Sequence, residues 1–288
     1  MLAFHSYWTA PGRVRSGAVA LSDYDLVTML LSALEWRRHN GQIRMVTDTP
    51  GARLFEALGL LSLWDAGLDT SLDTLTDIDP YLFWAAGKLY ALSRMDCPCV
   101  MLDTDMVFWE PVSDKLDGKR VVVAHFEPLN DAVYPPPETV FHLAEDYAFP
   151  PNWDFSLFPA NTAFLYMPER AFARTYTEAA FAFMRALRNR DVDPTVSMCF
   201  AEQRILPMCA RASGQALDAL LDAETVHTQR FVTHLWGHKR LLAASPGRCE
   251  AYCLQCVRRM LFDFPEQVSL FAGIERLRPY LIKLASVP

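Results

Sequence analysis

The chain has 288 residues, of which 51% are hydrophobic and 21% charged, with only 12 glycines and 19 prolines. This composition is typical of a packed globular protein and excludes a disordered, collagen-like or coiled-coil chain. The formal net charge is -7 and basic residues form no stripe, so we do not expect nucleic acid as a main partner. No stretch reaches the roughly 18 consecutive apolar residues of a membrane helix, and the N-terminus lacks a signal-peptide pattern. We therefore expect a cytoplasmic protein without a transmembrane segment.

The seven cysteines predict reduced thiols rather than a disulfide framework, because their number is odd and Cys97 and Cys99 lie within an apolar run. Such thiols favour a reducing compartment.

Three further cysteines, Cys249, Cys253 and Cys256, have the spacing of a radical-SAM iron–sulfur site. The same positions fall on one helical face together with Met260, which is the pattern of a buried stripe. We interpret them as core residues, and a zinc site completed by Cys209 is a lesser alternative.

The first part of the chain alternates between short apolar runs and amphipathic stretches. Leu2–Trp8 reads as a strand, and Ser22-Asp23 can cap a helix that Asn40-Gly41 would end. Ile43–Thr47 reads as a second strand, after which Pro50-Gly51 opens another helix. This alternation of strands and helices is typical of βαβ units.

The alternation continues with a helix predicted from about Pro80 to Met95, a strand at Cys99–Leu102 and a buried apolar run at Arg120–Ala124. Such alternation favours the α/β class, with a mostly parallel, Rossmann-like twisted sheet and helices on both faces.

The middle of the chain changes character between residues 126 and 158, which are rich in proline and aromatic residues. We predict a long, ordered, irregular insertion that faces substrate. Beyond it we expect a strand at Ala163–Met167, helices at Arg170–Arg188 and near Ala216–Leu221, an apolar run at Phe231–Leu235 and a helical tail from about Arg248. We see no linker. Residues 1–240 are therefore predicted to form a catalytic domain on which a helical tail, residues 241–288, packs.

The strongest local signal is an acidic pair, Asp103 and Asp105, with Thr104 between them and apolar residues on both sides. In an extended chain, two carboxylates two residues apart point the same way, so both can reach one hard divalent cation. They follow a buried strand, at the edge where open α/β sheets bind ligands. A solvated turn with two acids is the alternative interpretation.

A second cluster contains His234, Gly237 and Lys239. The imidazole of His234 could complete a metal site, Gly237 would let a ligand approach the backbone, and Lys239 suits phosphate. A lone histidine is also compatible with a structural, hydrogen-bonded role.

In the order of these motifs, the chain resembles the nucleotide-sugar glycosyltransferases of the GT-A fold and is similar to their galactosyl- and glycogenin-like branch. The resemblance spans about Phe4 to Arg240. It implies that Asp103 and Asp105 hold manganese or magnesium on the donor diphosphate, that His234 is a further ligand, and that Gly237 and Lys239 contact the diphosphate.

The resemblance also covers Asn161, which matches the strand entry that lines the sugar pocket, although Ala163 stands where that family usually has glycine. The pair Glu202-Gln203 matches an acid–glutamine pair near the reacting centre. The late motif departs from the family, since one residue rather than two separates Gly237 from Lys239 and no Pro-Trp follows. The His-Ser-Tyr-Trp start is also similar to bacterial families of unknown function.

Five more residues are candidates for donor binding. Lys88, the only base in its stretch, could contact phosphate or sugar hydroxyls, or be a solvated helix charge. Tyr7 and Trp8 could stack on a nucleobase or belong to the core. Thr47 and Asp48 could contact base or ribose, unless Asp48 only caps the next helix.

The sequence therefore predicts a metal-dependent glycosyltransferase that moves a hexose from a UDP-sugar to an acceptor, which could be a glycan, a protein or a small molecule. A bridging cation would neutralise the charge of the departing diphosphate as a Lewis acid. The alternatives are a catalytically silent module that binds nucleotide sugar or carbohydrate and, less favoured, a radical-SAM or zinc protein.

Overall fold

The computed structural model describes residues 1–222 and 228–286. Within these ranges, seven strands form one sheet in the order β3-β2-β1-β4-β7-β6-β8, and β5 pairs with β9 in a second, two-stranded sheet. The pairs β1–β2, β1–β4, β2–β3 and β6–β8 are parallel, whereas β7 is antiparallel to both β4 and β6. The strands are β1 Leu2–Tyr7, β2 Ile43–Thr47, β3 Leu68–Asp69, β4 Cys99–Leu102, β5 Met106–Phe108, β6 Val121–Phe126, β7 Ala160–Met167, β8 Leu217–Ala219 and β9 Val232–His234.

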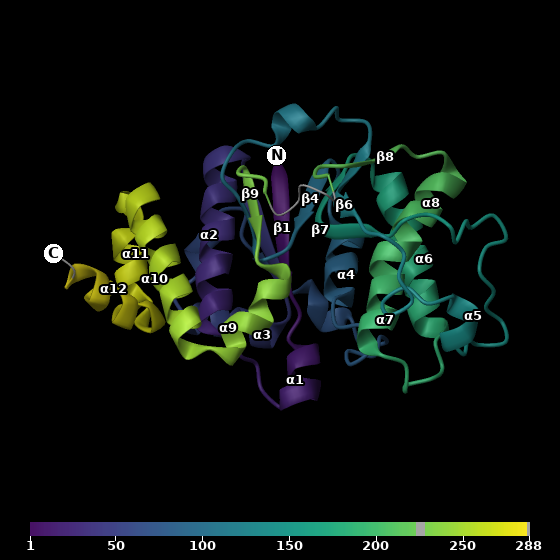
Figure 1. The fold of residues 1–288 in the computed structure, drawn as a ribbon, viewed down its shortest axis with the longest axis horizontal. Helices are drawn as coiled ribbons and strands as arrows, with labels where there is room; N and C mark the ends of the chain where they lie inside the picture. Colours follow the sequence, from purple (N-terminus) through teal and green to yellow (C-terminus); the bar gives the residue numbers. More distant parts are fainter. Residues whose placement is uncertain (223–227, 287–288) are drawn as a thin grey trace.

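Helices cover both faces of the large sheet (Figure 1). On one face lie α2, α10, α11 and α12, and on the other lie α4, α6, α7 and α8. The predicted α/β class, with a mostly parallel sheet between helices, is confirmed.

The helices are α1 Ala10–Ser16, α2 Asp23–His39, α3 Thr49–Ala57, α4 Ala86–Arg94, α5 Pro137–Val140, α6 Arg170–Ala186, α7 Pro194–Cys199, α8 Ile205–Ser213, α9 Lys239–Ala244, α10 Pro246–Asp263, α11 Val268–Gly273 and α12 Arg278–Ala285. None of the described helices is both long and apolar enough to span a bilayer.

The sequence signals locate the first elements closely. The Ser22 side chain accepts a hydrogen bond from the backbone N–H of Asp25 and so caps α2, which ends before Asn40 as predicted. Strands β2 and β4 have the predicted bounds. Residues 126–158 are mostly irregular apart from the short α5, as expected.

Two predictions of helices need correction. The helix predicted from Pro80 begins only at Ala86, after a series of turns. The helix predicted near Ala216–Leu221 is wrong, because this segment contains β8, which pairs in parallel with β6 from Val121 onwards. Gly214 ends α8 in the left-handed conformation, with φ 71°, and the chain then joins the sheet edge. Tertiary pairing overrides the weak helical pattern there.

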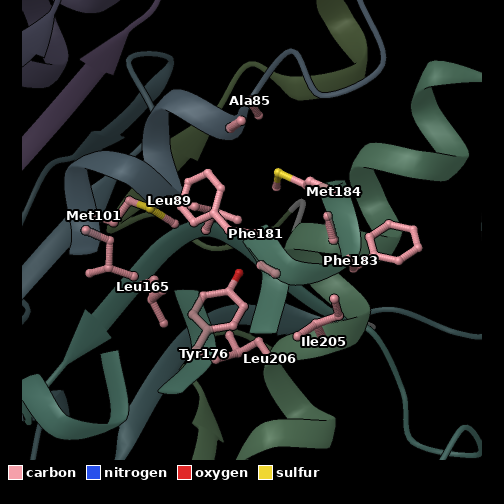
Figure 2. Close-up of a cluster of buried hydrophobic side chains, with 14 of the residues drawn as sticks. Ala85, Leu89, Met101, Leu165, Tyr176, Phe181, Phe183, Met184, Ile205 and Leu206 are labelled. Carbon is pink, nitrogen blue, oxygen red and sulfur yellow. The ribbon is translucent and has the colours of Figure 1, made fainter. Parts of the chain in front are cut away.

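The core has two parts, because alternate residues of each central strand point to opposite faces of the sheet. Ala3 and Val100 join the cluster under α2 and α10, whereas Phe4 and Met101 join the cluster under α4 and α6. Figure 2 shows part of the second cluster, in which Tyr176 and other α6 side chains pack against residues of α4, β4, β7 and α8.

The cysteines of α10 are part of the first cluster. Cys253 and Cys256 are buried, Cys249 is half-buried, and all are free thiols. Cys209 lies in the cluster on the other face of the sheet, so the structure does not assemble the alternative zinc site. The core interpretation of this stripe agrees with its packing.

Glycine at position 87 lets α4 approach β1 closely. A Cβ atom at Gly87 would lie 2.8 Å from Cβ of Trp8, a distance that side chains do not tolerate. Any larger residue would push α4 away from the end of β1.

One buried acid links α2 to α10. Glu35 is fully buried and faces Asp263, while Nε2 of His39 lies 3.3 Å from its carboxylate. Arg38 and Arg259 both pair with Asp263. Burial, followed by the negative charge of Asp263, raises the pKa of Glu35 to about 7. The folded protein therefore holds a proton on Glu35 more tightly than the unfolded chain does.

This pKa predicts the sign of a pH effect on stability. The stabilisation from protonated Glu35 is complete below the unfolded value near 4.5 and is lost as the pH rises towards 7. We expect Glu35→Gln to make the protein more stable than wild type at pH 8, by roughly 1–3 kcal/mol, and to lose this advantage at pH 4.5. Urea unfolding across this pH range measures the difference, with the exposed Glu56→Gln as control. A difference that does not change with pH would contradict the prediction.

Candidate functional site

A cavity of about 260 Å³ lies where β1 and β4 end. Tyr7 and Trp8 line it from the end of β1, and the acidic pair lines it just after β4. Asn161 lines it from the start of β7, because this antiparallel strand begins at the edge where β4 ends. The predicted location at the carboxyl edge of the sheet thus coincides with a cavity.

Asp103 and Asp105 lie in a tight turn between β4 and β5. The backbone N–H of Met106 donates to the carbonyl of Asp103 at 3.1 Å, and Asp103 N–H donates to Ala163 across the sheet at 2.8 Å. The prediction that the two acids share an extended segment is therefore wrong. Both carboxylates still line the same cavity.

The small sheet brings the second predicted cluster to the acids, since Met106 of β5 is paired with His234 of β9. Nε2 of His234 lies 3.6 Å from Asp105, and Nζ of Lys239 lies 3.0 Å from the other oxygen of this carboxylate. Burial alone would raise the pKa of Asp105, but His234 and then Lys239 outweigh it and hold this pKa below its usual range. Asp105 is therefore ionised.

Asp103, Asp105 and His234 fit a divalent cation. One potential ligand atom from each lies within 4.8 Å of the other two, and this is the only such group of three or more among the described residues. Carboxylate oxygens and an imidazole nitrogen are both ligands that divalent metal ions accept.

Lys88 lines the cavity between two carboxylates. Its ammonium lies 2.6 Å from Oδ1 of Asp103 and 2.6 Å from Oε1 of Glu202, and the side chain is 15% exposed. Burial would lower the pKa of Lys88, but the two carboxylates raise it above the ordinary value. The alternative of a solvated helix charge is thus wrong, because the helix points this side chain into the cavity.

Glu202 and Gln203 belong to a π-helical segment, Phe200–Arg204, inserted between α7 and α8. Glu202 accepts a 2.5 Å hydrogen bond from Thr162, and Tyr176 donates to its backbone carbonyl at 2.5 Å. The extra residue of a π-turn rotates neighbouring side chains, and here both members of the pair line the cavity.

The insertion supplies polar groups that the sequence analysis missed. Tyr134, which is buried, contacts Glu127 and Gln203, and Asn161 donates to Glu127 at 2.7 Å. Burial, followed by the charge of Glu127, raises the pKa of Tyr134, so its hydroxyl keeps its proton. Proline and aromatic content indicated an ordered insertion, but no spacing in the sequence pointed to these contacts.

Three predicted residues do not line the cavity. Thr47 is buried and its hydroxyl donates to the carbonyl of Tyr7 at 2.5 Å. Asp48 caps α3 by accepting from Gly51 and also accepts from the Thr9 hydroxyl at 2.6 Å, so its capping role holds. Gly237 is exposed in the turn after β9. Thr104 and Lys239 do line the cavity.

Two exposed tryptophans were also missed. Trp84 is 40% exposed and Trp236 is 46% exposed, yet both line the cavity. Trp236 has φ 22°, and its indole is stacked on the His234 ring with centroids 6.2 Å apart. Trp236 lies inside the late motif that the sequence singled out, whereas Trp84 had been assigned to a helix.

The ion pairs of Lys88 predict a stability effect in the metal-free protein. Lys88→Met would leave two largely buried carboxylates without their counter-charge, and we expect a loss of about 2 kcal/mol or more. Adding Glu202→Gln should restore part of the loss, because one unpaired charge is removed. Urea unfolding with a chelator measures the effect, with the exposed Lys119→Met as control. Equal stability of the Lys88 and Lys119 variants would refute the buried pair.

The comparisons with known proteins give one family. Residues 1–270 match a family of unknown function (DUF6734), and the chain belongs to this family. No curated protein matches the chain.

Several solved structures are similar at low identity. An active-site mutant of LgtC is 10% identical over 76% of this chain and 72% of that one, with a TM-score of 0.39. Mouse xyloside xylosyltransferase 1 in its apo form is 10% identical over 76% and 84% of the two chains, with a TM-score of 0.37. The bifunctional glycosyltransferase WbbM in its apo form is 10% identical over 70% of this chain and 37% of that one, with a TM-score of 0.37.

Proposed function

We propose that this protein is a metal-dependent glycosyltransferase that transfers a hexose from a UDP-sugar to an acceptor. The observation that carries the proposal is the convergence of Asp103, Asp105 and His234 on one point of the cavity. The three come from the β4–β5 turn and from β9, which the pairing of Met106 with His234 brings together.

These three residues would hold manganese or magnesium. Bound there, the cation would supply Lewis-acid stabilisation for the negative charge on the departing nucleoside diphosphate. Lys239, which is half-buried and 3.0 Å from Asp105, provides a second positive charge beside the same position. Tyr7 and Trp8 provide aromatic surface for the nucleobase.

The sugar would bind beside Asn161, Glu202 and Gln203, which also line the cavity. The Lys88 ammonium and the Thr162 hydroxyl both donate to Oε1 of Glu202, which fixes this carboxylate. A carboxylate held in one orientation can stabilise positive charge that develops on the sugar ring.

A second candidate is a module that binds a nucleotide sugar without turnover. It is favoured by the lysine partners of the acidic pair, because Lys88 contacts Asp103 and Lys239 contacts Asp105, so each carboxylate already has a counter-charge. The two candidates differ in metal dependence and in hydrolysis of the donor.

The metal role of Asp105 can be tested by Asp105→Asn, which keeps the size of the side chain and removes one charge. We expect affinity for manganese and for uridine diphosphate to fall together, by tenfold or more each, since a bridging cation couples the two binding events. Calorimetric titrations of wild type with manganese, wild type with chelator, and the variant with manganese measure both affinities.

The exposed Asp131→Asn is the matched control for charge removal, and its affinities should equal those of wild type. If chelated wild type binds uridine diphosphate as tightly as the metal-loaded protein, the metal-dependent proposal fails and the silent module is favoured.

Glu202→Gln tests the reacting centre, because it removes charge while it keeps the shape of the side chain. We expect turnover of the donor to fall about 100-fold with nearly unchanged affinity for uridine diphosphate. This is the signature of an interaction made mainly in the transition state. Steady-state hydrolysis of UDP-hexoses with manganese provides the rates. An equal loss of nucleotide affinity would assign Glu202 to binding or structure instead.

A further inference from the structure

Four polar side chains form a hydrogen-bonded chain along one wall of the cavity. The hydroxyl oxygen of Tyr134 lies 2.6 Å from Oε2 of Glu127 and 2.5 Å from Oε1 of Gln203, so one hydroxyl faces two acceptor oxygens. The other carboxylate oxygen of Glu127 accepts from the amide of Asn161 at 2.7 Å. Asn161 and Gln203 line the cavity. Tyr134 and Glu127 contact them but do not belong to the lining.

The hydrogen-bond count determines which end of the Gln203 amide faces the cavity. Tyr134 has one hydroxyl proton, and a carboxylate accepts more strongly than an amide, so this proton goes to Glu127. The close contact with Gln203 then requires a donor from Gln203. The two ends of an amide have nearly the same shape and are assigned by such counts. The count therefore exchanges the two ends of the Gln203 amide relative to the contact at Oε1, so that the NH₂ group faces Tyr134 and the carbonyl oxygen is turned to the cavity.

Asn161 is oriented by the same carboxylate. Its carbonyl accepts from the backbone N–H of Ala163 at 3.0 Å, and one of its amide hydrogens goes to Glu127. Its second amide hydrogen is left for the cavity. The wall thus offers one fixed acceptor, from Gln203, and one fixed donor, from Asn161.

We propose that Tyr134 and Glu127 are positioning residues that fix the orientation of these two amides and thereby determine which sugar epimer the cavity accepts. The specificity role rests on the proposed glycosyltransferase function, whereas the amide orientation does not. A sugar hydroxyl beside Gln203 must donate and one beside Asn161 must accept. An epimer with one hydroxyl moved leaves a cavity amide unpaired, and such sites reject it strongly.

The first experiment needs no substrate and measures the orientation itself. In protein labelled with ¹⁵N at glutamine side chains, the NH₂ signals of Gln203 are assigned by their loss in Gln203→Ala. Tyr134→Phe removes the acceptor oxygen, so these signals should shift upfield. Tyr147→Phe is the matched control, because Tyr147 lies in the same insertion and is half-buried; it should leave the signals unchanged. Unchanged Gln203 signals in Tyr134→Phe would overturn the assigned orientation.

The second experiment measures specificity through kcat/KM for two UDP-hexoses that differ at a single hydroxyl. We expect Tyr134→Phe to reduce the ratio of the two values about tenfold, with unchanged affinity for uridine diphosphate and no added effect in a Gln203→Ala background. A merely structural role would lower both rates equally.

An unchanged ratio, or an effect that multiplies with that of Gln203→Ala, would overturn the positioning role while the donor still binds. If wild type binds no UDP-hexose, the proposed function and the specificity role both fail, and the spectra of the first experiment still decide the orientation.

Discussion

A buried ammonium group between two carboxylates is the interaction on which the cavity depends. Lys88 lies 2.6 Å from both Asp103 and Glu202, so it joins α4, the turn after β4 and the π-helical segment before α8. None of these charges could be buried alone, because an unpaired ion loses its hydration without compensation. This arrangement requires glycine at position 87, because a Cβ atom there would collide with Trp8 and move the helix that carries Lys88.

The charged side chains that line the cavity explain why it would suit a cation and an anion together in the proposed function. Three acidic side chains, Asp103, Asp105 and Glu202, line it along with two lysines, Lys88 and Lys239. The carboxylates exceed the ammonium groups by one, so a divalent cation beside the acids is favourable. A diphosphate alone would meet an excess of negative charge, and the cation reverses this excess.

Much of the architecture could be predicted because it depends on local pattern. Apolar runs and caps such as Ser22 give strands and helices near their observed bounds, and the acidic pair falls at the predicted edge of the sheet. Segment β8 could not be predicted, because its pairing with a distant strand decides its conformation. The contacts of Lys88, Tyr134 and Glu127 were missed for the same reason: each depends on residues more than five positions away, which no spacing rule records.

In the proposed function, a divalent cation and the two lysines would compete for the same carboxylate oxygens of Asp103 and Asp105. Lys239 contacts Asp105 and Lys88 contacts Asp103, so each carboxylate has a counter-charge beside it. In the proposed function, a cation bound to these acids would weaken their hold on the lysines, and the ammonium groups would then be available to phosphate oxygens. Lysine suits this exchange, because its ammonium is a point charge on a flexible stem. In the proposed function, the same two side chains would pair with the acids of the cavity and complement the charge of a diphosphate, which would couple the binding of metal and donor.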